Sequence, residues 1–234
     1  MQDLGDGYAM EYSSYYKNFP LSTNEKTDLI KIPQMVTLDP EGMANKLHLS
    51  LQAIKGKTDF ELMVDQDAFD RRINKGILPT VTIEDHIFYV DLKMDMLRPK
   101  DDFTSKGIVF SSIENYYDMD ERTYTIPYNP KTHEFEKLDL ANIKEIPKNI
   151  VAVSFPSERI LDRIGWNKKF GFDPIHGLKL AGLTMHYKAK NVPWDKTPLP
   201  DIIHSNLEME KRKLEKEIHP TQENAQQKSR GRKL

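Results

Sequence analysis

The sequence predicts an α+β fold, with antiparallel β-hairpins and packed helices in a single mixed domain and a separate C-terminal helix. Two observations lead to this class. Several segments place apolar residues at every second position, the period of a half-buried strand, and they alternate with segments of helical period that begin at capping residues. In addition, hydrophobic residues make up 38% of the 234 residues, which is enough to form a buried core.

Four regions follow one another along the chain. We predict an acidic, aromatic-rich arm over 1–37, an α+β core domain over 38–196, an amphipathic helix over 197–219 and a disordered basic tail over 220–234. The core is assigned where strand and helix periods recur, and the tail is assigned where no apolar period is left.

The N-terminal arm carries a series of aromatic residues at helical spacing. Their offsets place the rings on one face of a predicted helix: Tyr8, Tyr12, Tyr15, Tyr16 and Phe19. Two interpretations stay open. Either the arm docks on its own core, since large rings need a surface that buries them, or Tyr8, Tyr12 and Tyr16 form a strip that binds a protein partner.

The first helix of the core is predicted to begin at Asp39, a capping residue, with Pro40 at the first helical position. Apolar residues then recur at helical spacing until Gly56 ends the run: Met43, Leu47, Leu51 and Ile54. This pattern predicts one helix up to Ile54.

A short strand and a second helix are expected next. Phe60, Leu62 and Val64 alternate with polar residues as in a strand. Asp65 then supplies the cap of a helix that ends at Gly76 and carries Ala68, Phe69 and Ile73.

The rest of the core is predicted to consist mainly of strands. Two hairpins are expected, one over 80–92 and one over 122–138, because alternating segments flank polar turns. The segment 150–155 is largely apolar on both faces, as in a central strand that is covered on both sides. A weaker strand is expected over 185–189.

Charge and composition exclude several functional classes. The 34 basic residues nearly balance the 36 acidic ones, so the chain has no overall field that would attract nucleic acid or an anionic membrane. The absence of cysteine excludes disulfides, thiolate zinc sites, iron–sulfur clusters and cysteine nucleophiles. No nucleotide-binding or serine-hydrolase motif is present, and no cofactor is expected.

The location of the protein is inferred from its apolar segments. The first residues lack the basic and apolar regions of a signal peptide. No apolar run approaches the roughly 20 residues of a membrane helix. We therefore expect a cytoplasmic protein without membrane contact.

The sharpest catalytic pattern is the pair Asp91 and Lys93 at the end of the first hairpin. It resembles the acid-x-Lys strand of restriction-type nucleases, in which carboxylates hold a divalent cation and the lysine assists the attacking water. The site would need a second acid, for which Asp65 and Asp67 are candidates. A solvated Asp and Lys on the polar face of a hairpin explain the pattern equally well.

Two further groups of polar residues are weak candidates for metal sites. Asp173, His176 and His186 are the only grouping of possible zinc ligands, and their spacing fits no known site. The acidic run 118–121 has oxygen ligands that suit a hard cation, but it lacks the glycine and the distal glutamate of a calcium loop. Structural or surface histidines and an ordinary acidic turn are the simpler interpretations.

The C-terminal helix carries a narrow apolar stripe of Ile203, Leu207, Leu214 and Ile218. The stripe either packs on the core domain or binds another chain, in which case Leu207 and Leu214 make the contact. The tail that follows is basic: Lys228, Arg230, Arg232 and Lys233. It either contacts nucleic acid weakly and without sequence preference, or it only solubilises the chain.

Three central stretches carry a resemblance: LRPKDDFTSKGIVFSSIENYYD, IPYNPKTHEFEKLDLANI and LDRIGWNKKFGFDPIHGLK. They resemble an uncharacterised group of bacterial proteins carried on conjugative transposons and related mobile elements. The similarity spans about residues 38 to 194, and a basic end such as KSRGRKL recurs in the group. The group has no established activity, cofactor or catalytic residue, so the resemblance implies only a cytoplasmic accessory role in mobile-element biology.

Two functional hypotheses follow from these observations. The first is a non-catalytic accessory or adaptor protein that binds a protein partner through the aromatic arm or the C-terminal helix. The second is a nucleic-acid-binding protein, with or without metal-dependent cleavage at Asp91 and Lys93.

Overall fold

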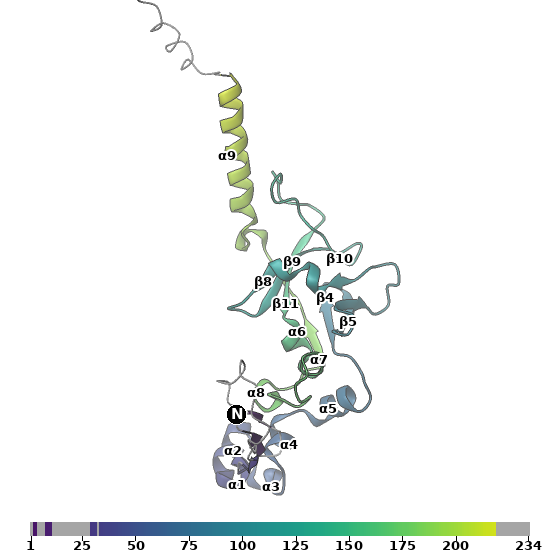
Figure 1. The fold of residues 1–234 in the computed structure, drawn as a ribbon, viewed down its shortest axis with the longest axis vertical. Coiled ribbons are helices and arrows are strands. Elements are labelled where there is room, and N and C mark those ends of the chain that lie inside the picture. Colours follow the sequence, from purple (N-terminus) through teal and green to yellow (C-terminus); the bar gives the residue numbers. More distant parts are fainter. Residues whose placement is uncertain (1, 4–7, 11–28, 32, 219–234) are drawn as a thin grey trace, which may run out of the picture.

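The computed structural model of the chain describes residues 2–3, 8–10, 29–31 and 33–218. It confirms the α+β class. Two five-stranded sheets occupy the centre, short helices lie at one end, and α9 (Leu199–Ile218) extends from the opposite end (Figure 1). Within the described residues, no helix combines the length and the apolar character needed to cross a bilayer.

Part of the N-terminal arm forms strands. β1 (Gln2–Asp3), β2 (Tyr8–Met10) and β3 (Leu29–Lys31) pair in an antiparallel sheet with β2 in the middle. The helix predicted through Tyr8 is therefore wrong at that residue, because its backbone pairs with neighbouring strands instead of forming helical turns. The other aromatic positions of the predicted strip lie outside the described residues: Tyr12, Tyr15, Tyr16 and Phe19.

The region 35–73 consists of short helices: α1 (Met35–Leu38), α2 (Pro40–Leu47), α3 (Leu51–Ile54), α4 (Asp59–Met63) and α5 (Gln66–Ile73). The predicted cap is confirmed, since Asp39 accepts a hydrogen bond from the Gly42 N–H at 2.8 Å and Pro40 opens α2. The single helix expected up to Ile54 is wrong. His48 takes a left-handed conformation with φ 55°, which ends α2 and separates it from α3.

The strand predicted at 60–64 is a helix. Thr58 and Glu61 form a capping box, in which each side chain accepts a hydrogen bond from the backbone N–H of the other residue. This reciprocal cap starts α4 and outweighs the alternation of the three apolar residues. The next cap is confirmed, because Asp65 accepts from the Ala68 N–H at 3.0 Å at the start of α5.

Sheet I has the strand order β12-β4-β5-β6-β7. Its members are β4 (Thr80–Ile83), β5 (His86–Asp91), β6 (Met96–Pro99), β7 (Ile108–Val109) and β12 (His186–Lys188). The hairpin predicted over 80–92 is confirmed, with a two-residue turn between β4 and β5. β4 and β12 pair in parallel, so the fold is not purely antiparallel. Parallel strands need a long connection between them, and here the connecting segment includes several helices.

Sheet II is entirely antiparallel. Its members are β8 (Tyr117–Asp118), β9 (Thr123–Asn129), β10 (Glu134–Phe135), β11 (Val151–Pro156) and β13 (Lys190–Val192). The order is β10-β9-β11-β13, and β8 also pairs with β9. The hairpin predicted over 122–138 is confirmed in a shorter form, and β11 is the central strand that its apolar faces predict.

One segment, 186–192, belongs to both sheets, and we call it the shared strand. It pairs with β4 as β12 and then with β11 as β13. Between the two, Ala189 donates its N–H to the Thr82 carbonyl at 2.8 Å. Backbone hydrogen bonds therefore join sheet I to sheet II along this side.

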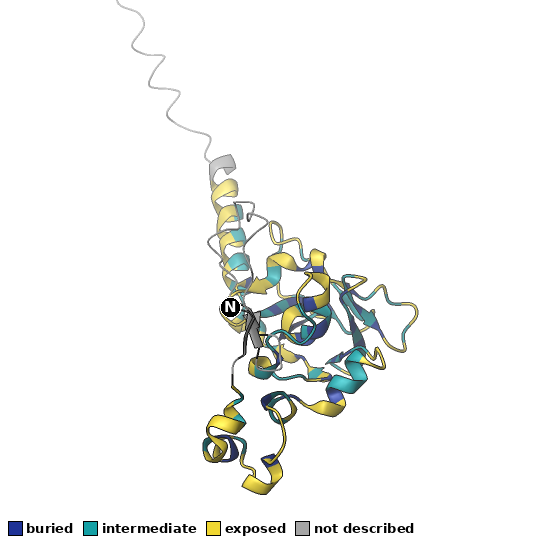
Figure 2. Cartoon of the chain, turned by 60° about the horizontal axis from the view of Figure 1, so that its bottom comes forward, coloured by how far each residue is buried: buried dark blue, intermediate teal, exposed yellow. Residues whose placement is uncertain are grey.

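The inner faces of the two sheets enclose the main core. Alternate positions of their strands supply its buried side chains: Val81, Ile83, Phe88, Val90, Leu97, Ile108, Tyr124, Ile126, Tyr128, Val153 and Phe155. Figure 2 shows these strands largely buried, whereas α9 is exposed along most of its length. Because inward side chains form the core, the outward side chains of sheet II are free to shape a surface.

A layer of helices connects the N-terminal helices to the sheets. It contains α6 (Glu158–Leu161), α7 (Arg163–Lys169) and α8 (Leu178–Ala181). Arg72 of α5 donates two hydrogen bonds of 3.0 and 2.7 Å to Asp162, which also caps α7 at Gly165. The Asp162 side chain is fully buried and Arg72 is nearly so. Around this ion pair, α4, α5, α7 and α8 pack through Phe60, Val64, Phe69, Ile73, Ile164 and Leu178.

Candidate partner-binding cleft

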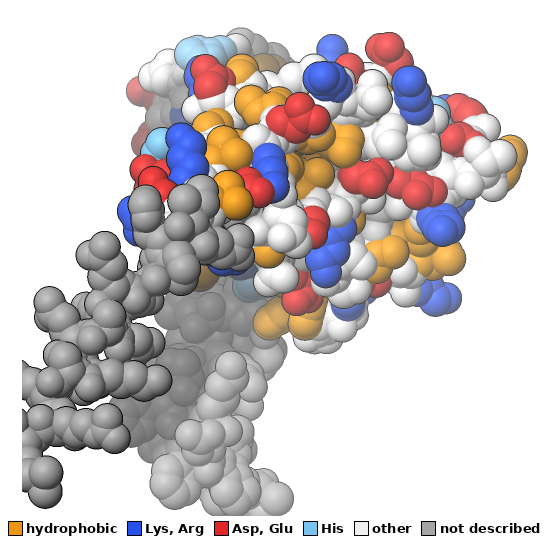
Figure 3. All heavy atoms as spheres, turned by 90° about the horizontal axis from the view of Figure 1, so that it is seen from above, with side chains coloured by type: hydrophobic (Ala, Val, Ile, Leu, Met, Phe, Trp, Pro, Cys, Tyr) orange, Lys and Arg blue, Asp and Glu red, His pale blue; other side chains and the backbone are white. Residues whose placement is uncertain are grey.

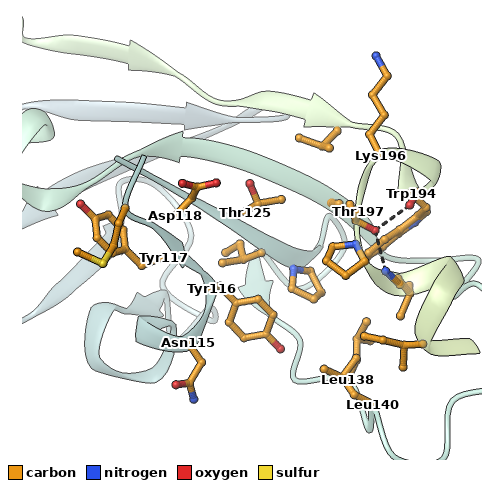
Figure 4. Close-up of a pocket in the computed structure, with 18 residues that line it drawn as sticks. Asn115, Tyr116, Tyr117, Asp118, Thr125, Leu138, Leu140, Trp194, Lys196 and Thr197 are labelled. Carbon is orange, nitrogen blue, oxygen red and sulfur yellow. Dashed lines mark hydrogen bonds between the residues drawn. The ribbon is translucent and has the colours of Figure 1, made fainter. Parts of the chain in front are cut away.

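A cleft of about 620 Å³ lies on the outer face of sheet II, at the base of α9 (Figure 4). Its floor comes from residues of three neighbouring strands: Thr125 and Pro127 of β9, Ala152 of β11 and Val192 of β13. The volume falls in the range of roughly 300–1,000 Å³ that is typical of ligand sites in proteins.

The walls of the cleft come from segments that are far apart in the sequence. One wall is formed by η3 (Glu114–Tyr116) and β8, with the rings of Tyr116 and Tyr117. The other wall is formed by η4 (Trp194–Lys196) and the first turn of α9, with Trp194 and Leu199. Leu138 and Leu140 contribute at the α9 side (Figure 4).

Two polar side chains of the cleft, those of Thr197 and Asp118, are engaged within the protein. The Thr197 hydroxyl donates to the Trp194 carbonyl at 2.7 Å and accepts from the Leu199 N–H at 3.3 Å. Asp118 accepts hydrogen bonds from the backbone N–H groups of its own turn, those of Asp120 and Glu121, at 2.8 and 3.0 Å. The lining contains no histidine, and its titratable side chains are those of Asp118, Lys196, Tyr116 and Tyr117.

The surface seen from the α9 end carries charges of both signs. In Figure 3 the acidic and basic side chains of the described residues are interspersed, and apolar side chains lie exposed between them. Nucleic-acid interfaces usually present a patch or stripe of basic residues. Among the residues described, this face shows no such stripe.

Asp91 is the last residue of β5, and Lys93 lies in the turn that follows it. The Asp91 carboxylate accepts hydrogen bonds from the Met94 N–H at 3.2 Å and from the Arg98 guanidinium at 3.4 Å, and Lys93 is exposed. The acids considered as its metal partners lie elsewhere, since Asp65 caps α5 and Asp67 pairs with Arg71 on that helix.

The weaker metal candidates are engaged separately. Asp173 accepts from the Ile175 N–H at 2.9 Å, the His176 ring stacks on Phe172, and His186 contacts the Thr80 hydroxyl at 2.8 Å. Across the described part of the chain, no three His, Asp or Glu side chains converge as a metal site would require.

The predicted partner-binding residues fall in different places. Leu207 and Leu214 are exposed on α9. Tyr8 lies in β2, and Tyr12 and Tyr16 lie outside the described residues. The basic residues of the tail also lie outside them: Lys228, Arg230, Arg232 and Lys233.

A cluster of titratable side chains, which sequence reasoning missed, closes the other side of the two sheets. Here the His86 ring stacks on the His133 ring with centroids 4.0 Å apart, and His133 Nδ1 contacts Asp102 at 2.7 Å. The Ser105 hydroxyl donates to the His133 carbonyl at 3.0 Å. We call His86, Asp102, Ser105 and His133 the polar latch. It ties the β4–β5 turn and the loop before β7, both of sheet I, to the β9–β10 turn of sheet II.

The latch has a distinct electrostatic character. Hydrogen bonds from Thr104 and His133 hold the pKa of Asp102 well below its usual value. Burial and the neighbouring charge of His133 lower the pKa of His86. Burial, together with the charges of Glu84 and Asp102, raises the pKa of the Tyr128 hydroxyl.

Each latch residue comes from a segment that reads as an ordinary turn, and for this reason the cluster was not foreseen. Glu84 and His133 have left-handed backbone conformations with φ 52° and 56°. Such conformations in non-glycine residues concentrate at sites where the surrounding structure holds them in place. The only signal in the sequence was the presence of histidine at two hairpin turns.

Comparison of the chain with protein-family models, with curated proteins and with solved structures finds no match.

Proposed function

We propose that this chain is a non-catalytic adaptor that binds an apolar segment of a protein partner in the cleft on sheet II. The observation that carries the proposal is the cleft itself, an open hollow of about 620 Å³ lined by aromatic and aliphatic side chains with Trp194 at its wall. A cytoplasmic accessory role for a bacterial mobile element, implied by the sequence resemblance, is part of the same proposal.

The composition of the cleft supports a protein segment as its occupant. Tyr116, Tyr117 and Trp194 offer large rings with polar edges, the residue types enriched where proteins bind each other. Pro127 and Pro198 keep the floor and one wall rigid, so little ordering is needed on binding. Asp118 and Lys196 also line the cleft and carry opposite charges (Figure 4).

The test fills the cleft without altering the core. Thr125→Trp places a large ring on the outward face of β9, where the wild-type side chain lines the floor. Thr82→Trp is the matched control, because Thr82 is also a half-buried outward residue in the middle of a strand, but it lies in sheet I away from the cleft. Circular dichroism and thermal unfolding establish that both variants are folded.

The measurement is affinity capture of the wild type and both variants from nuclease-treated extract of the native host, with quantitative mass spectrometry. We expect one set of proteins to be enriched equally by the wild type and Thr82→Trp, and to fall at least about tenfold with Thr125→Trp, since a ring in the floor removes the volume that the partner occupies. Equal capture by both variants contradicts the cleft proposal.

The same experiment weighs the nucleic-acid alternative. If capture disappears on nuclease treatment and returns with added nucleic acid, the adaptor role is wrong. Removal of residues 221–234 then tests the basic tail, whose contribution should weaken steeply with salt.

A further inference from the structure

The first half of α9 is held by the body of the protein. Asn206 donates hydrogen bonds of 2.9 Å to the carbonyls of Leu140 and Ile143, and Glu210 pairs with Lys144 at 2.5 Å. Glu210 is the last residue of α9 for which a hydrogen bond or ion pair with the body is seen in the described part of the chain. Beyond it the helix projects into solvent (Figures 1 and 2).

Apolar side chains are exposed in both halves of α9. Leu207, in the held half, is 36% exposed, and Leu214, in the projecting half, is 51% exposed, although both belong to the apolar stripe of the helix. A helix in a protein gains most of its stability by packing an apolar face. The exposed apolar stripe of α9 is therefore expected to need a covering surface.

The apolar stripe is symmetric about its own midpoint. Its members are Ile203, Leu207, Leu214 and Ile218, and the midpoint lies between positions 210 and 211. In a twofold pair of antiparallel helices, residue i of one copy faces residue j of the other and the reverse contact is identical. That arrangement sets position 207 of each copy opposite position 214 of the other, and position 203 opposite 218.

The two halves of α9 carry complementary charges in the same arrangement. At 100° per residue, Glu208 and Lys211 lie on one flank of the stripe, and Glu210 and Lys213 lie on the other. A twofold axis brings like flanks together, so Glu208 comes near Lys211 of the second copy and Glu210 near Lys213, although Lys211 and Glu210 also come near their own counterparts at the axis. Within 199–210 the helix has three acids and no Lys or Arg, whereas 211–213 are all basic.

Glu208 and Glu210 already form ion pairs within one chain, but these pairs are too weak to prevent pairing with a second copy. Glu208 contacts Arg212 at 3.4 Å and His204 at 3.3 Å along the same helix, and Glu210 contacts Lys144. These side chains are all exposed by 43% or more. Exposed pairs contribute little, so they exchange readily for pairs with a second copy.

We propose that α9 binds α9 of a second copy of this chain in an antiparallel pair centred between residues 210 and 211. The apolar stripe of α9 shares no residue with the lining of the cleft on sheet II, and the proposal does not depend on the cleft. It develops the interpretation in which Leu207 and Leu214 contact another chain.

The first test measures mass in solution by sedimentation velocity over a concentration series. We expect the full chain to shift from its monomer mass of 27.2 kDa toward twice that value as concentration rises. Leu207→Asp and Leu214→Asp should stay monomeric, and Ser205→Asp, on the opposite and exposed face of the helix, should behave as the wild type. A wild type that remains at 27.2 kDa throughout overturns the proposal.

The second test determines whether the two helices run parallel or antiparallel. Because the chain contains no cysteine, an introduced cysteine is the only thiol in its chain. Chains carrying Leu207→Cys and Leu214→Cys are oxidised separately and as an equal mixture, with a tag on one chain to identify mixed dimers. Antiparallel pairing predicts a mixed disulfide in at least about tenfold excess over either homodimer. Homodimers that form as readily as the mixed species indicate parallel pairing and contradict the proposal.

Discussion

The two sheets are joined at two places by different kinds of contact. On one side the shared strand 186–192 donates backbone hydrogen bonds to both sheets. On the other side the polar latch joins them through side chains, chiefly His133 and Asp102. A backbone ladder tolerates changes of charge and pH, whereas a contact between imidazole and carboxylate depends on both. We therefore expect the junction at the shared strand to be insensitive to pH and the junction at the polar latch to depend on it.

The largest effect is expected from breaking the shared strand. Ala189→Pro removes the N–H that bonds to Thr82 and places a rigid ring inside a sheet. We expect a loss of more than about 3 kcal/mol in the free energy of unfolding, since an unsatisfied buried carbonyl alone costs roughly 1–3 kcal/mol. Urea denaturation measures the loss. Ala189→Ser keeps the N–H and should lose clearly less; equal losses would show that the hydrogen bond is not the cause.

The next loss of stability is expected from breaking the buried ion pair between Arg72 and Asp162. Asp162→Ala leaves Arg72 nearly buried without its partner and removes the cap of α7. We expect a loss of about 3–5 kcal/mol in unfolding free energy, the usual cost of leaving one buried charge unpaired. The double variant Arg72→Ala/Asp162→Ala should lose less than the sum of the single variants. Additive losses would mean that the two residues act independently.

The latch should respond to acid. The pKa of His86 in the folded protein lies below 6.5, its ordinary value in an unfolded chain, so between these two pKa values the folded protein binds fewer protons than the unfolded chain. The stability due to His86 is therefore complete above pH 6.5 and falls as the pH drops below it. The pKa of Asp102 is also lowered, so its contribution to stability is lost at more acidic pH, as the pH falls below 3.8, the ordinary pKa of an aspartate.

The measurement for the latch is the unfolding free energy between pH 7.5 and 4.5. His86→Gln should flatten the fall that begins near pH 6.5, whereas His204→Gln, which changes an exposed histidine of α9, should leave it unchanged. Hydrogen exchange of residues 100–107 should rise over the same range in the wild type. An unaltered pH profile in His86→Gln would contradict the assignment.

The smallest loss of stability is expected from breaking an exposed ion pair. Lys169 of α7 pairs with Asp95 of the β5–β6 turn at 3.1 Å, and both side chains are more than one-third exposed. Lys169→Ala should change the unfolding free energy by less than about 1 kcal/mol, because solvent screens such pairs. A larger loss, measured in urea, would show that this contact supports the core as the shared strand does.

The elements that local patterns specify were predictable. The hairpin of β4 and β5 follows from the alternation of Val81, Ile83, Phe88 and Val90, and α5 follows from its cap at Asp65. The helix over Leu199–Ile218 follows from its apolar stripe and its supporting pairs of charges. In these cases neighbouring residues supply the energy that decides the structure.

The errors arose where two local signals competed. At 60–64 the apolar alternation indicated a strand, but the capping box of Thr58 and Glu61 stabilises a helix at the same place. At His48 a left-handed residue divides a run whose apolar spacing is continuous. Spacing alone does not report either feature.

The cleft and the latch were not predictable because they depend on contacts between distant segments. Tyr117 and Trp194 face the same hollow only after β12 and β13 have joined the two sheets. Asp102 and His133 meet across 31 positions of sequence. In the sequence each of these residues belongs to an unremarkable loop or turn, and only the fold brings them together.

The late position of the shared strand has a consequence for the synthesis of the protein. Thr80 and its neighbour His186 are 106 residues apart, so β4 leaves the ribosome long before its edge partner exists. Until residue 192 has emerged, sheet I and sheet II each present an unpaired edge strand that can recruit other chains. A chain that is cut short before this segment should aggregate instead of folding, and production of the full-length protein should depend on chaperones that shield these edges during translation.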